Sequence, residues 1–304
     1  MPNRIYIIAG EASGDLHGGN LVRELFALAD DPQLRIRAWG GDRMAAAGAE
    51  VVKHYRELAF MGFTQVIMNL RTILRNFDTC KKDIEEFHPD ALILIDYPGF
   101  NLRIAEWAHA KGIPVHYYIS PQVCAWNKKR IPKMVRLLDE MLCLFPFEKP
   151  IFEEAGLETT FVGHPLVDEL EEKRIHGVVR EDLLVGLFPG SREREVAKLF
   201  PTMIETAKRL KAWRGDLKFE VPAASHKLAV QIRGLLDGAG ASSLIQANVG
   251  ESHALMQRAC CAVIASGTAT LEAAYYGLPY CLVYRVAPLT YAAAKVLVKI
   301  KHIG

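Results

Sequence analysis

Short apolar runs alternate with longer amphipathic segments along the whole chain, and this alternation restricts the possible folds more than any other feature. The runs that we predict to be strands in the first half are residues 5–9, 34–39, 91–95, 115–119, 140–144 and 160–162. In the second half they are residues 183–188, 218–221, 244–247, 262–265 and 280–284. Strands that alternate with helices favour parallel sheets covered by helices on both faces. The nearly continuous Val, Ile and Leu content of the runs is typical of such buried strands.

A charge-rich stretch from residue 168 to residue 182 divides the chain into two halves of similar plan. Each half opens with a buried strand and a glycine-containing turn, and the stretch between them has no strand character. A length of 304 residues also fits two domains, because domains contain about 150 residues each. We therefore predict an α/β protein with two Rossmann-like domains, residues 1–168 and 169–304, whose parallel sheets face each other across a cleft. Ligands are expected at the carboxyl ends of the strands.

The charges of the chain nearly cancel, and this excludes one class of function. There are 37 Lys and Arg against 35 Asp and Glu, a formal net charge of +2, which is too little for a strongly basic nucleic-acid-binding protein. The six cysteines form no CxxC pair. The first apolar run is too short for a signal peptide, and no run approaches the length of a transmembrane helix. These features predict a cytoplasmic location.

The first candidate site is the turn Gly10-Glu-Ala-Ser-Gly14-Asp15, which directly follows the first predicted strand. Glycines allow close approach of the backbone, and the start of a helix offers free N–H groups to a polar ligand. Ser13 and Gly14 are therefore candidates for contact with a substrate. The turn is not GxGxxG, which weakens a dinucleotide interpretation. The alternative is a tight structural turn in which Ser13 or Asp15 caps the helix.

The second candidate is Asp96, in Ile95-Asp-Tyr-Pro-Gly-Phe-Asn101. It follows the buried strand 91–95, so its carboxylate is expected at the carboxyl edge of the sheet. A carboxylate in that position can have a raised pKa and act as a general base. The alternative is an Asp that helps to cap the next helix.

Two turns in the second half are candidates for binding a nucleotide. They are Phe188-Pro-Gly-Ser-Arg192 and Ala265-Ser-Gly-Thr-Ala-Thr-Leu-Glu272, each between a strand and a helix. Small residues and free N–H groups suit phosphates, Arg192 suits a diphosphate, and Glu272 suits ribose hydroxyls. The alternatives are a surface Arg and a capping box. The predicted nucleotide-binding residues are Ser191, Arg192, Ser266, Gly267, Thr268, Thr270 and Glu272.

An apolar segment, residues 58–77, has the spacing of an amphipathic helix. Such a stripe is typical of a core helix, and the sharper interpretation is contact with a membrane surface or with acyl chains. The residues assigned to that contact are Phe60, Met61, Phe63, Met68 and Arg71. The sequence contains no HExxH, no His and Cys cluster, no GxSxG elbow and no P-loop. We therefore expect no metal site, and we do not expect a serine hydrolase.

Together these motifs resemble the lipid-A-disaccharide synthase family, glycosyltransferases of the two-Rossmann GT-B type. The resemblance rests on the four candidate turns described above, on Met61-Gly-Phe63, and on three further segments. The three are Ser120-Pro-Gln-Val-Cys-Ala-Trp126, Leu144-Phe-Pro-Phe-Glu148 and Phe161-Val-Gly-His-Pro165. All of them occur in the order of the family and cover the whole chain.

The resemblance implies a reaction in lipid A, and hence lipopolysaccharide, biosynthesis. UDP-2,3-diacylglucosamine donates its sugar to 2,3-diacylglucosamine 1-phosphate with inversion, giving a β-1,6-linked disaccharide and UDP. By resemblance, Asp96 is the general base for the acceptor 6-hydroxyl. Arg192 and the turn at residues 266–270 stabilise UDP without a metal or other cofactor, and Glu272 holds the ribose.

The resemblance also implies partners and a location. Ser13 and Gly14 line the cleft from the first domain, and Gln122 and Trp126 belong to its wall. The segment 60–77 then contacts acyl chains or the membrane, so the enzyme is peripheral on the inner face of the inner membrane, and a homodimer is an open possibility.

Two departures from the family pattern leave alternatives open. Position 124 is Cys where the family usually has Trp, and the family continues several dozen residues past Gly304. The alternatives are a truncated UDP-sugar-binding protein without catalysis, or another GT-B enzyme such as a UDP-N-acetylglucosamine 2-epimerase. An NAD-linked oxidoreductase ranks last, because the fingerprint glycines are absent.

Overall fold

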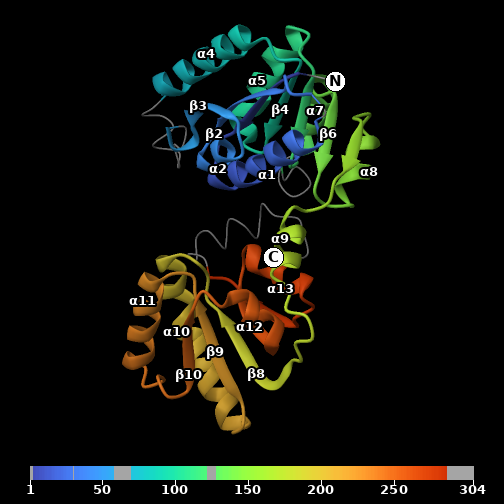
Figure 1. The fold of residues 1–304 in the computed structure, drawn as a ribbon. Coiled ribbons are helices and arrows are strands. Elements are labelled where there is room, and N and C mark those ends of the chain that lie inside the picture. Colours follow the sequence, from blue (N-terminus) through green and yellow to red (C-terminus); the bar gives the residue numbers. More distant parts are fainter. Residues whose placement is uncertain (1–2, 30, 58–69, 122–127, 286–304) are drawn as a thin grey trace. The chain divides into compact units, whose positions relative to one another are not determined.

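The computed structural model describes residues 3–29, 31–57, 70–121 and 128–285. The chain divides into two compact units, Met1–Pro165 and Leu166–Gly304, which we call unit 1 and unit 2 and describe separately (Figure 1). The division at Pro165 precedes helix α9 (Leu166–Glu172), and the predicted boundary after residue 168 lies inside that helix.

Unit 1 is built on a sheet of seven parallel strands in the order β3-β2-β1-β4-β5-β6-β7. The strands are β1 (Arg4–Ala9), β2 (Arg35–Gly40), β3 (Glu50–His54), β4 (Ala91–Ile95), β5 (Val115–Tyr118), β6 (Glu140–Cys143) and β7 (Thr159–Phe161). Strand β3 was not predicted, because its sequence EVVKH is polar at both ends and no residue in it is fully buried. As an edge strand it needs less apolar surface than its neighbours.

Helices cover both faces of the unit 1 sheet. They are α1 (Ala12–Leu28), α2 (Asp42–Ala46), α4 (Leu70–Phe87), α5 (Pro98–Ala110), α7 (Ile131–Leu137) and α8 (Glu148–Glu153), with short 3-10 turns at Tyr55–Glu57 and Lys128–Arg130. Successive side chains of a strand point to opposite faces. Ile5 and Ile7 of β1 accordingly pack with α1 and α2, whereas Tyr6 and Ile8 pack with α4, α5 and α7.

Unit 2 repeats this plan with five parallel strands in the order β10-β9-β8-β11-β12. The strands are β8 (Glu181–Phe188), β9 (Lys218–Ala223), β10 (Ile245–Val249), β11 (Ala259–Ala265) and β12 (Tyr280–Val283). The helices are α9, α10 (Glu193–Trp213), α11 (His226–Gly238), α12 (Ser252–Arg258) and α13 (Thr268–Tyr275). One core cluster joins α10 and α11 to the sheet, and the other joins α9, α12 and α13 to its opposite face.

The strand order reverses beside the first strand of each unit. In unit 1, β1 lies between β2 and β4; in unit 2, β8 lies between β9 and β11. Connections leave in opposite directions at such a switch point, which opens a crevice at the carboxyl ends of the two central strands. The four turns that the sequence singled out follow β1, β4, β8 and β11, so each pair lies at the switch point of its own sheet.

The apolar segment 58–77 is described only in part. Helix α4 runs from Leu70 to Phe87, ten residues beyond the predicted end, because Cys80, Ile84 and Phe87 continue the stripe into the core. Phe60, Met61, Phe63 and Met68 lie outside the described residues, as does the side chain of Arg71.

Candidate functional site

Asp96 lies at the switch point of unit 1, directly after β4, in a turn that the surrounding side chains hold in place. Asp96 and Tyr97 have left-handed backbones, with φ of 45° and 48°, which is unfavourable for residues other than glycine. The Asp96 carbonyl accepts hydrogen bonds from Asn101 Nδ2 at 2.8 Å and from the Tyr117 hydroxyl at 2.5 Å. The Asp96 N–H donates to the Tyr118 carbonyl at 3.1 Å. The main chain is therefore fixed, and the carboxylate is not needed to hold it.

The surroundings of the Asp96 carboxylate favour its protonated form. Burial and then the neighbouring Glu11 raise the pKa of Asp96, and a bond from the Tyr97 N–H opposes them. The alternative role of a helix cap is not observed, because α5 begins after Tyr97 without a side-chain cap. A half-buried carboxylate with a raised pKa at a switch point has the properties of a general base.

The turn after β1 supports this site, although not through the predicted caps. Helix α1 begins after Glu11 with no side-chain cap, so the interpretation of Ser13 or Asp15 as its cap is wrong. Asp15 is buried and instead accepts hydrogen bonds from the N–H groups of Gly41, Arg43 and Met44 at 2.7, 3.1 and 3.2 Å. It thereby anchors the start of α2 rather than of its own helix.

Glycine is required at position 10 for a steric reason. A Cβ there would lie 2.2 Å from the Tyr97 ring, so Tyr97 packs directly on the backbone of the first turn. Gly14 is buried, and a Cβ there would lie 3.1 Å from Ala9, whereas Ser13 is exposed. Of the two residues, only Ser13 offers a side chain at the surface, and its contact with a substrate stays a prediction.

Unit 2 contains a cavity of about 770 Å³ at its switch point. The residues that follow β8, β9, β10 and β11 line it, and they are joined by Lys173, Glu195 and Glu272. Six of the seven residues predicted to bind a nucleotide line this cavity: Ser191, Arg192, Ser266, Gly267, Thr268 and Glu272. Helices α10 and α13 both begin here without a side-chain cap, so their first N–H groups are available to an anion.

Thr270, the seventh predicted residue, does not line the cavity. Its side chain is buried, and its hydroxyl donates to the Gly267 carbonyl at 2.7 Å. Gly267 has φ of 156°, a conformation that essentially only glycine adopts. The buried Thr270 hydroxyl therefore holds the turn at Gly267 in place. The alternative interpretation of this turn, a capping box, is not observed.

Arg192 is both in the cavity and at the surface. Its side chain is 79% exposed, and Nη1 lies 2.7 Å from Glu195 Oε1. Glu195 also lies against the turn at residues 188–192. A Cβ added to Gly190 would lie only 2.6 Å from Glu195 Oε2. The arginine that lines the cavity is therefore paired with an acidic side chain beside it.

Several cavity residues were missed by the sequence reasoning. Lys173 and Glu195 line the cavity without having been predicted. For Glu272, which was predicted, burial and then Glu169 raise the pKa, whereas Lys173 lowers it. His253 also lines the cavity, and burial followed by Lys173 lowers its pKa. Lys173 belongs to the charge-rich stretch that marked the predicted boundary, and nothing in its spacing distinguishes it from a solvated charge.

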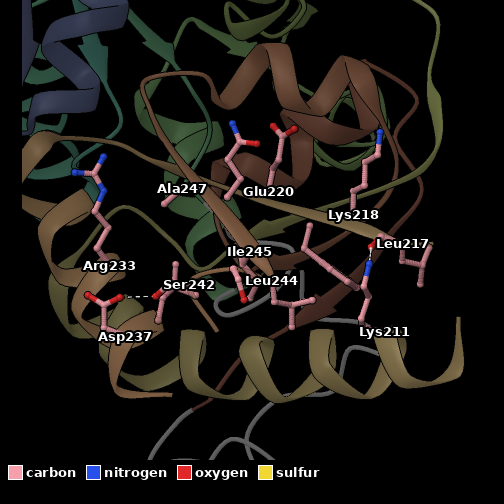
Figure 2. A pocket seen from close by; sticks show the side chains of 14 residues that line it. Lys211, Leu217, Lys218, Glu220, Arg233, Asp237, Ser242, Leu244, Ile245 and Ala247 are labelled. Atoms are coloured by element: carbon pink, nitrogen blue, oxygen red, sulfur yellow. Dashed lines mark hydrogen bonds between the residues drawn. The ribbon is translucent and has the colours of Figure 1, made fainter. Parts of the chain in front are cut away.

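A second cavity of about 610 Å³ lies at the amino end of the unit 2 sheet, where Figure 2 shows Lys211, Lys218 and Arg233 around it. Of its two acidic lining residues, Glu220 and Asp237, the latter accepts a hydrogen bond from the Ser242 hydroxyl. Lys211 donates to the Leu217 carbonyl at 2.8 Å. No glycine is among the described residues that line it. The candidate site in unit 2 is therefore the cavity at the carboxyl end.

Some predictions fall outside the described structure. Gln122, Trp126 and the departure at Cys124 are not described. Among the described residues, no helix is long and apolar enough to cross a membrane. Across the same residues, no three His, Cys, Asp or Glu side chains gather as a set of metal ligands.

Comparison with known sequences gives consistent matches over the full chain. The family model described as lipid-A-disaccharide synthetase matches residues 5–304. The lipid-A-disaccharide synthase of Geobacter sulfurreducens is 43% identical over 309 residues, covering 99% of this chain and 79% of that protein. Lipid-A-disaccharide synthase 1 of Legionella pneumophila (strain Paris) is 38% identical over 315 residues, covering 100% of this chain and 81% of that protein.

Comparison with solved structures shows the fold. A UDP-GlcNAc 2-epimerase from Neisseria meningitidis bound to UDP-GlcNAc has a TM-score of 0.59 at 12% identity, over 96% of this chain and 85% of that one. The glycotransferase of kitacinnamycin has a TM-score of 0.60 at 17% identity, over 97% of this chain and 84% of that one. These likenesses confirm the predicted α/β fold of the GT-B type with two parallel sheets.

Proposed function

The chain belongs to the lipid-A-disaccharide synthetase family, and from that premise we propose how its residues carry out the reaction. It is a hexosyltransferase of lipid A biosynthesis, with a sugar nucleotide as donor and a sugar as acceptor. The alternative of a 2-epimerase is not favoured, because the synthases are 38–43% identical and the epimerase likeness of 12% concerns the fold alone. For the substrates we propose UDP-2,3-diacylglucosamine and 2,3-diacylglucosamine 1-phosphate.

Asp96 is assigned the role of general base. The observation that carries this assignment is a half-buried carboxylate at the switch point of unit 1, with a raised pKa and a backbone fixed by Asn101 and Tyr117. In its ionised form it takes the proton of the acceptor 6-hydroxyl as that oxygen attacks the anomeric carbon of the donor. The bond from this carbon to the UDP oxygen breaks, and the configuration inverts.

The unit 2 cavity is assigned the role of stabilising the negative charge that develops on the leaving UDP. Arg192 and the N–H groups at the starts of α10 and α13 supply positive charge and hydrogen bonds, and fixed donors of this kind stabilise a developing anion. Glu272 is assigned to the ribose hydroxyls. Since these groups offset the charge, the proposal requires no metal ion, and a chelator is expected to leave the rate unchanged.

The test is a mass-spectrometric assay with both diacylated substrates in detergent, run with an Asp96→Asn control. Disaccharide and UDP formed only by the unaltered chain would support the transferase. No product, with UDP binding preserved, would indicate a chain that binds the nucleotide without catalysis. A folded chain that does not bind UDP would overturn the assignment of the cavity.

Because both proposed substrates are lipids, the chain is further proposed to act as a peripheral protein at the cytoplasmic face of the inner membrane. Three of the residues assigned to that contact are the apolar side chains Phe60, Met61 and Met68. Replacing all three by Ser is expected to reduce flotation with phospholipid vesicles. Unchanged flotation of a folded variant would remove these residues from the membrane contact.

A further inference from the structure

The Arg180 side chain bonds the carboxyl ends of two helices of unit 2. Arg180 directly precedes β8. Its Nη1 donates to the carbonyls of Met256 and Ala259 at 3.0 and 2.6 Å, and its Nη2 donates to the Tyr276 carbonyl at 2.6 Å. Met256 lies in the last turn of α12, Ala259 is the residue that follows α12, and Tyr276 is the residue that follows α13. One guanidinium therefore joins the end of α12 to the end of α13.

The chemistry of these three contacts explains why an arginine is suited to this position. The residues that carry the three carbonyls are buried, and the last carbonyls of a helix have no partner within that helix. A guanidinium is planar, carries five N–H donors in a fixed fork and stays charged. Its positive charge also interacts favourably with the negative end of each helix dipole. Arg180 thus satisfies buried acceptors and stabilises both helix ends.

The opposite ends of the same two helices form part of the nucleotide cavity. Residues 250–254 at the start of α12 and residues 265–269 at the start of α13 line it, and so does Glu272 in the second turn of α13. Neither helix begins with a side-chain cap, so the position of each start depends on contacts farther along the helix. The helices have seven and eight residues and are about 10–12 Å long. A bond at one end of such a short rigid helix therefore also places its other end.

Two other side chains attach α12 and α13 to the preceding chain, one helix at a time. The buried Gln257 of α12 donates through Nε2 to the Lys173 carbonyl at 3.1 Å and accepts through Oε1 from the Ile175 N–H at 2.7 Å. The Tyr276 hydroxyl, at the end of α13, donates to the Leu170 carbonyl at 3.0 Å. These bonds hold each helix against the segment before β8, but they do not join the two helices to each other.

The two helices also contact each other through aromatic rings. The centres of the His253 and Tyr276 rings lie 6.2 Å apart. Hydrogen bonds depend more strictly on distance and angle than a ring contact does. The three bonds from Arg180 are therefore well suited to fix the spacing between α12 and α13.

We propose that Arg180 is a positioning residue for the nucleotide: its guanidinium joins the carboxyl ends of α12 and α13 and thereby sets the spacing of the helix starts that line the cavity. The proposal rests on the proposed function, because it requires UDP to bind in this cavity. The effect passes through α13, which carries Glu272. It does not pass through α10, which follows Arg192 and packs on the opposite face of the sheet.

The first test measures the UDP affinity of Arg180→Ala by titration calorimetry, well below the thermal midpoint of the variant so that the chain is folded. The affinity is expected to fall about twofold to tenfold, the range for weakening one hydrogen bond to the ligand. If Arg180 only stabilised the fold, the thermal midpoint would fall and the UDP affinity of the folded chain would stay the same. Arg233→Ala removes a cation of α11 that does not line the nucleotide cavity and controls for net charge.

Rescue by a free guanidinium ion provides a second readout. Arg180 lines a separate cavity of about 340 Å³, so a small ion can reach the space that Arg180→Ala leaves. Guanidinium chloride, at a concentration far below that which unfolds the chain, is expected to restore the UDP affinity of Arg180→Ala and to leave the unaltered chain unchanged. Sodium chloride at the same concentration controls for ionic strength. If guanidinium had no effect on the variant, the guanidinium of Arg180 would not be the group that positions the helices.

A double-mutant cycle tests the route through α13. Arg180→Ala and Glu272→Gln act on the same helix, so their combined loss of UDP affinity should be smaller than the product of the single losses, by at least about twofold. With Arg192→Ala the losses should multiply, because the two sites are independent. If Arg180→Ala does not fold, Arg180→Lys replaces it, since lysine keeps the stem and the charge but has one nitrogen instead of two.

The outcomes separate the inference from the proposed function. Weaker UDP binding by the folded variant, coupled to Glu272→Gln and independent of Arg192→Ala, supports the role of Arg180. Unchanged UDP affinity would overturn it, and so would coupling to both of the other substitutions or to neither. An unaltered chain that does not bind UDP would instead overturn the proposed function.

Discussion

The two units share a fold plan but differ in the chemistry of their switch points. In unit 1 the turn after β4 carries an acid, Asp96. Its backbone is left-handed although neither Asp96 nor Tyr97 is a glycine. In unit 2 the turns after β8 and β11 contain Gly190 and Gly267, with φ of 108° and 156°, and end at uncapped helix starts. The same topology thus offers a carboxylate on a fixed main chain in one unit and uncapped helix starts in the other.

The difference has an energetic basis. A left-handed residue other than glycine costs about 1–3 kcal/mol, and in unit 1 the bonds from Asn101 and Tyr117 to the Asp96 carbonyl hold it. Unit 2 avoids that cost by using glycine, and its cavity remains open for a ligand. Unit 1 is therefore suited to moving a proton and unit 2 to holding an anion.

Asp96→Asn is the strongest test of this division and is expected to have the largest effect. Removing a general base lowers turnover by about 10²–10⁴-fold. Asn tolerates a left-handed backbone, so the turn should persist, and the affinity for UDP should remain unchanged because UDP binding is assigned to unit 2. Steady-state kinetics and UDP calorimetry on the same preparation check the loss of turnover and the unchanged UDP affinity. A loss of UDP affinity as large as the loss of turnover would contradict the division.

Arg192→Ala is the reciprocal test in unit 2. A charge-assisted bond to a phosphate contributes about 1.5–3 kcal/mol, so UDP affinity is expected to fall about tenfold or more. Arg192 is mostly exposed, so the thermal midpoint of the free protein should hardly change. Arg194→Ala changes a residue in the first turn of α10 that does not line the cavity, and it is the matched control. Unchanged UDP affinity for Arg192→Ala would leave Arg192 as a surface residue.

The sequence was sufficient to predict the parts of this comparison that depend on local patterns. Buried parallel strands are continuous apolar runs, so every strand except the polar edge strand β3 was expected, and each candidate turn follows a strand as predicted. Side-chain partners across the fold were harder to predict. Asp15 binds N–H groups 26 to 29 residues away, and no local rule distinguishes that from a helix cap. Lys173 and Glu195 were missed because charged residues are common on exposed turns and helices.

Glu11→Gln is expected to change the pH dependence of turnover by a smaller amount. Glu11 raises the pKa of Asp96, so removing its charge lowers that pKa. A general base must be ionised, and activity is lost as pH falls through its pKa. The acid limb of kcat/KM should therefore move to lower pH. The profile in unit 2 variants such as Arg192→Ala should keep its position. An acid limb that moves to higher pH, or does not move, would remove Glu11 from the control of Asp96.

Glu195→Gln is expected to have the smallest effect, in the opposite direction to the other changes. The carboxylate of Glu195 pairs with Arg192 and lies against Gly190, so in the free protein it holds the arginine and repels a phosphate in the adjoining turn. An exposed ion pair contributes about 0.2–1 kcal/mol, and neutralising Glu195 should therefore tighten UDP binding by less than about fivefold. Uridine lacks the phosphates, so its affinity should not change, which provides the control. Weaker UDP binding in Glu195→Gln would mean that Glu195 positions Arg192 for the phosphate instead of competing with it, and unit 2 would then hold its arginine as firmly as unit 1 holds its aspartate.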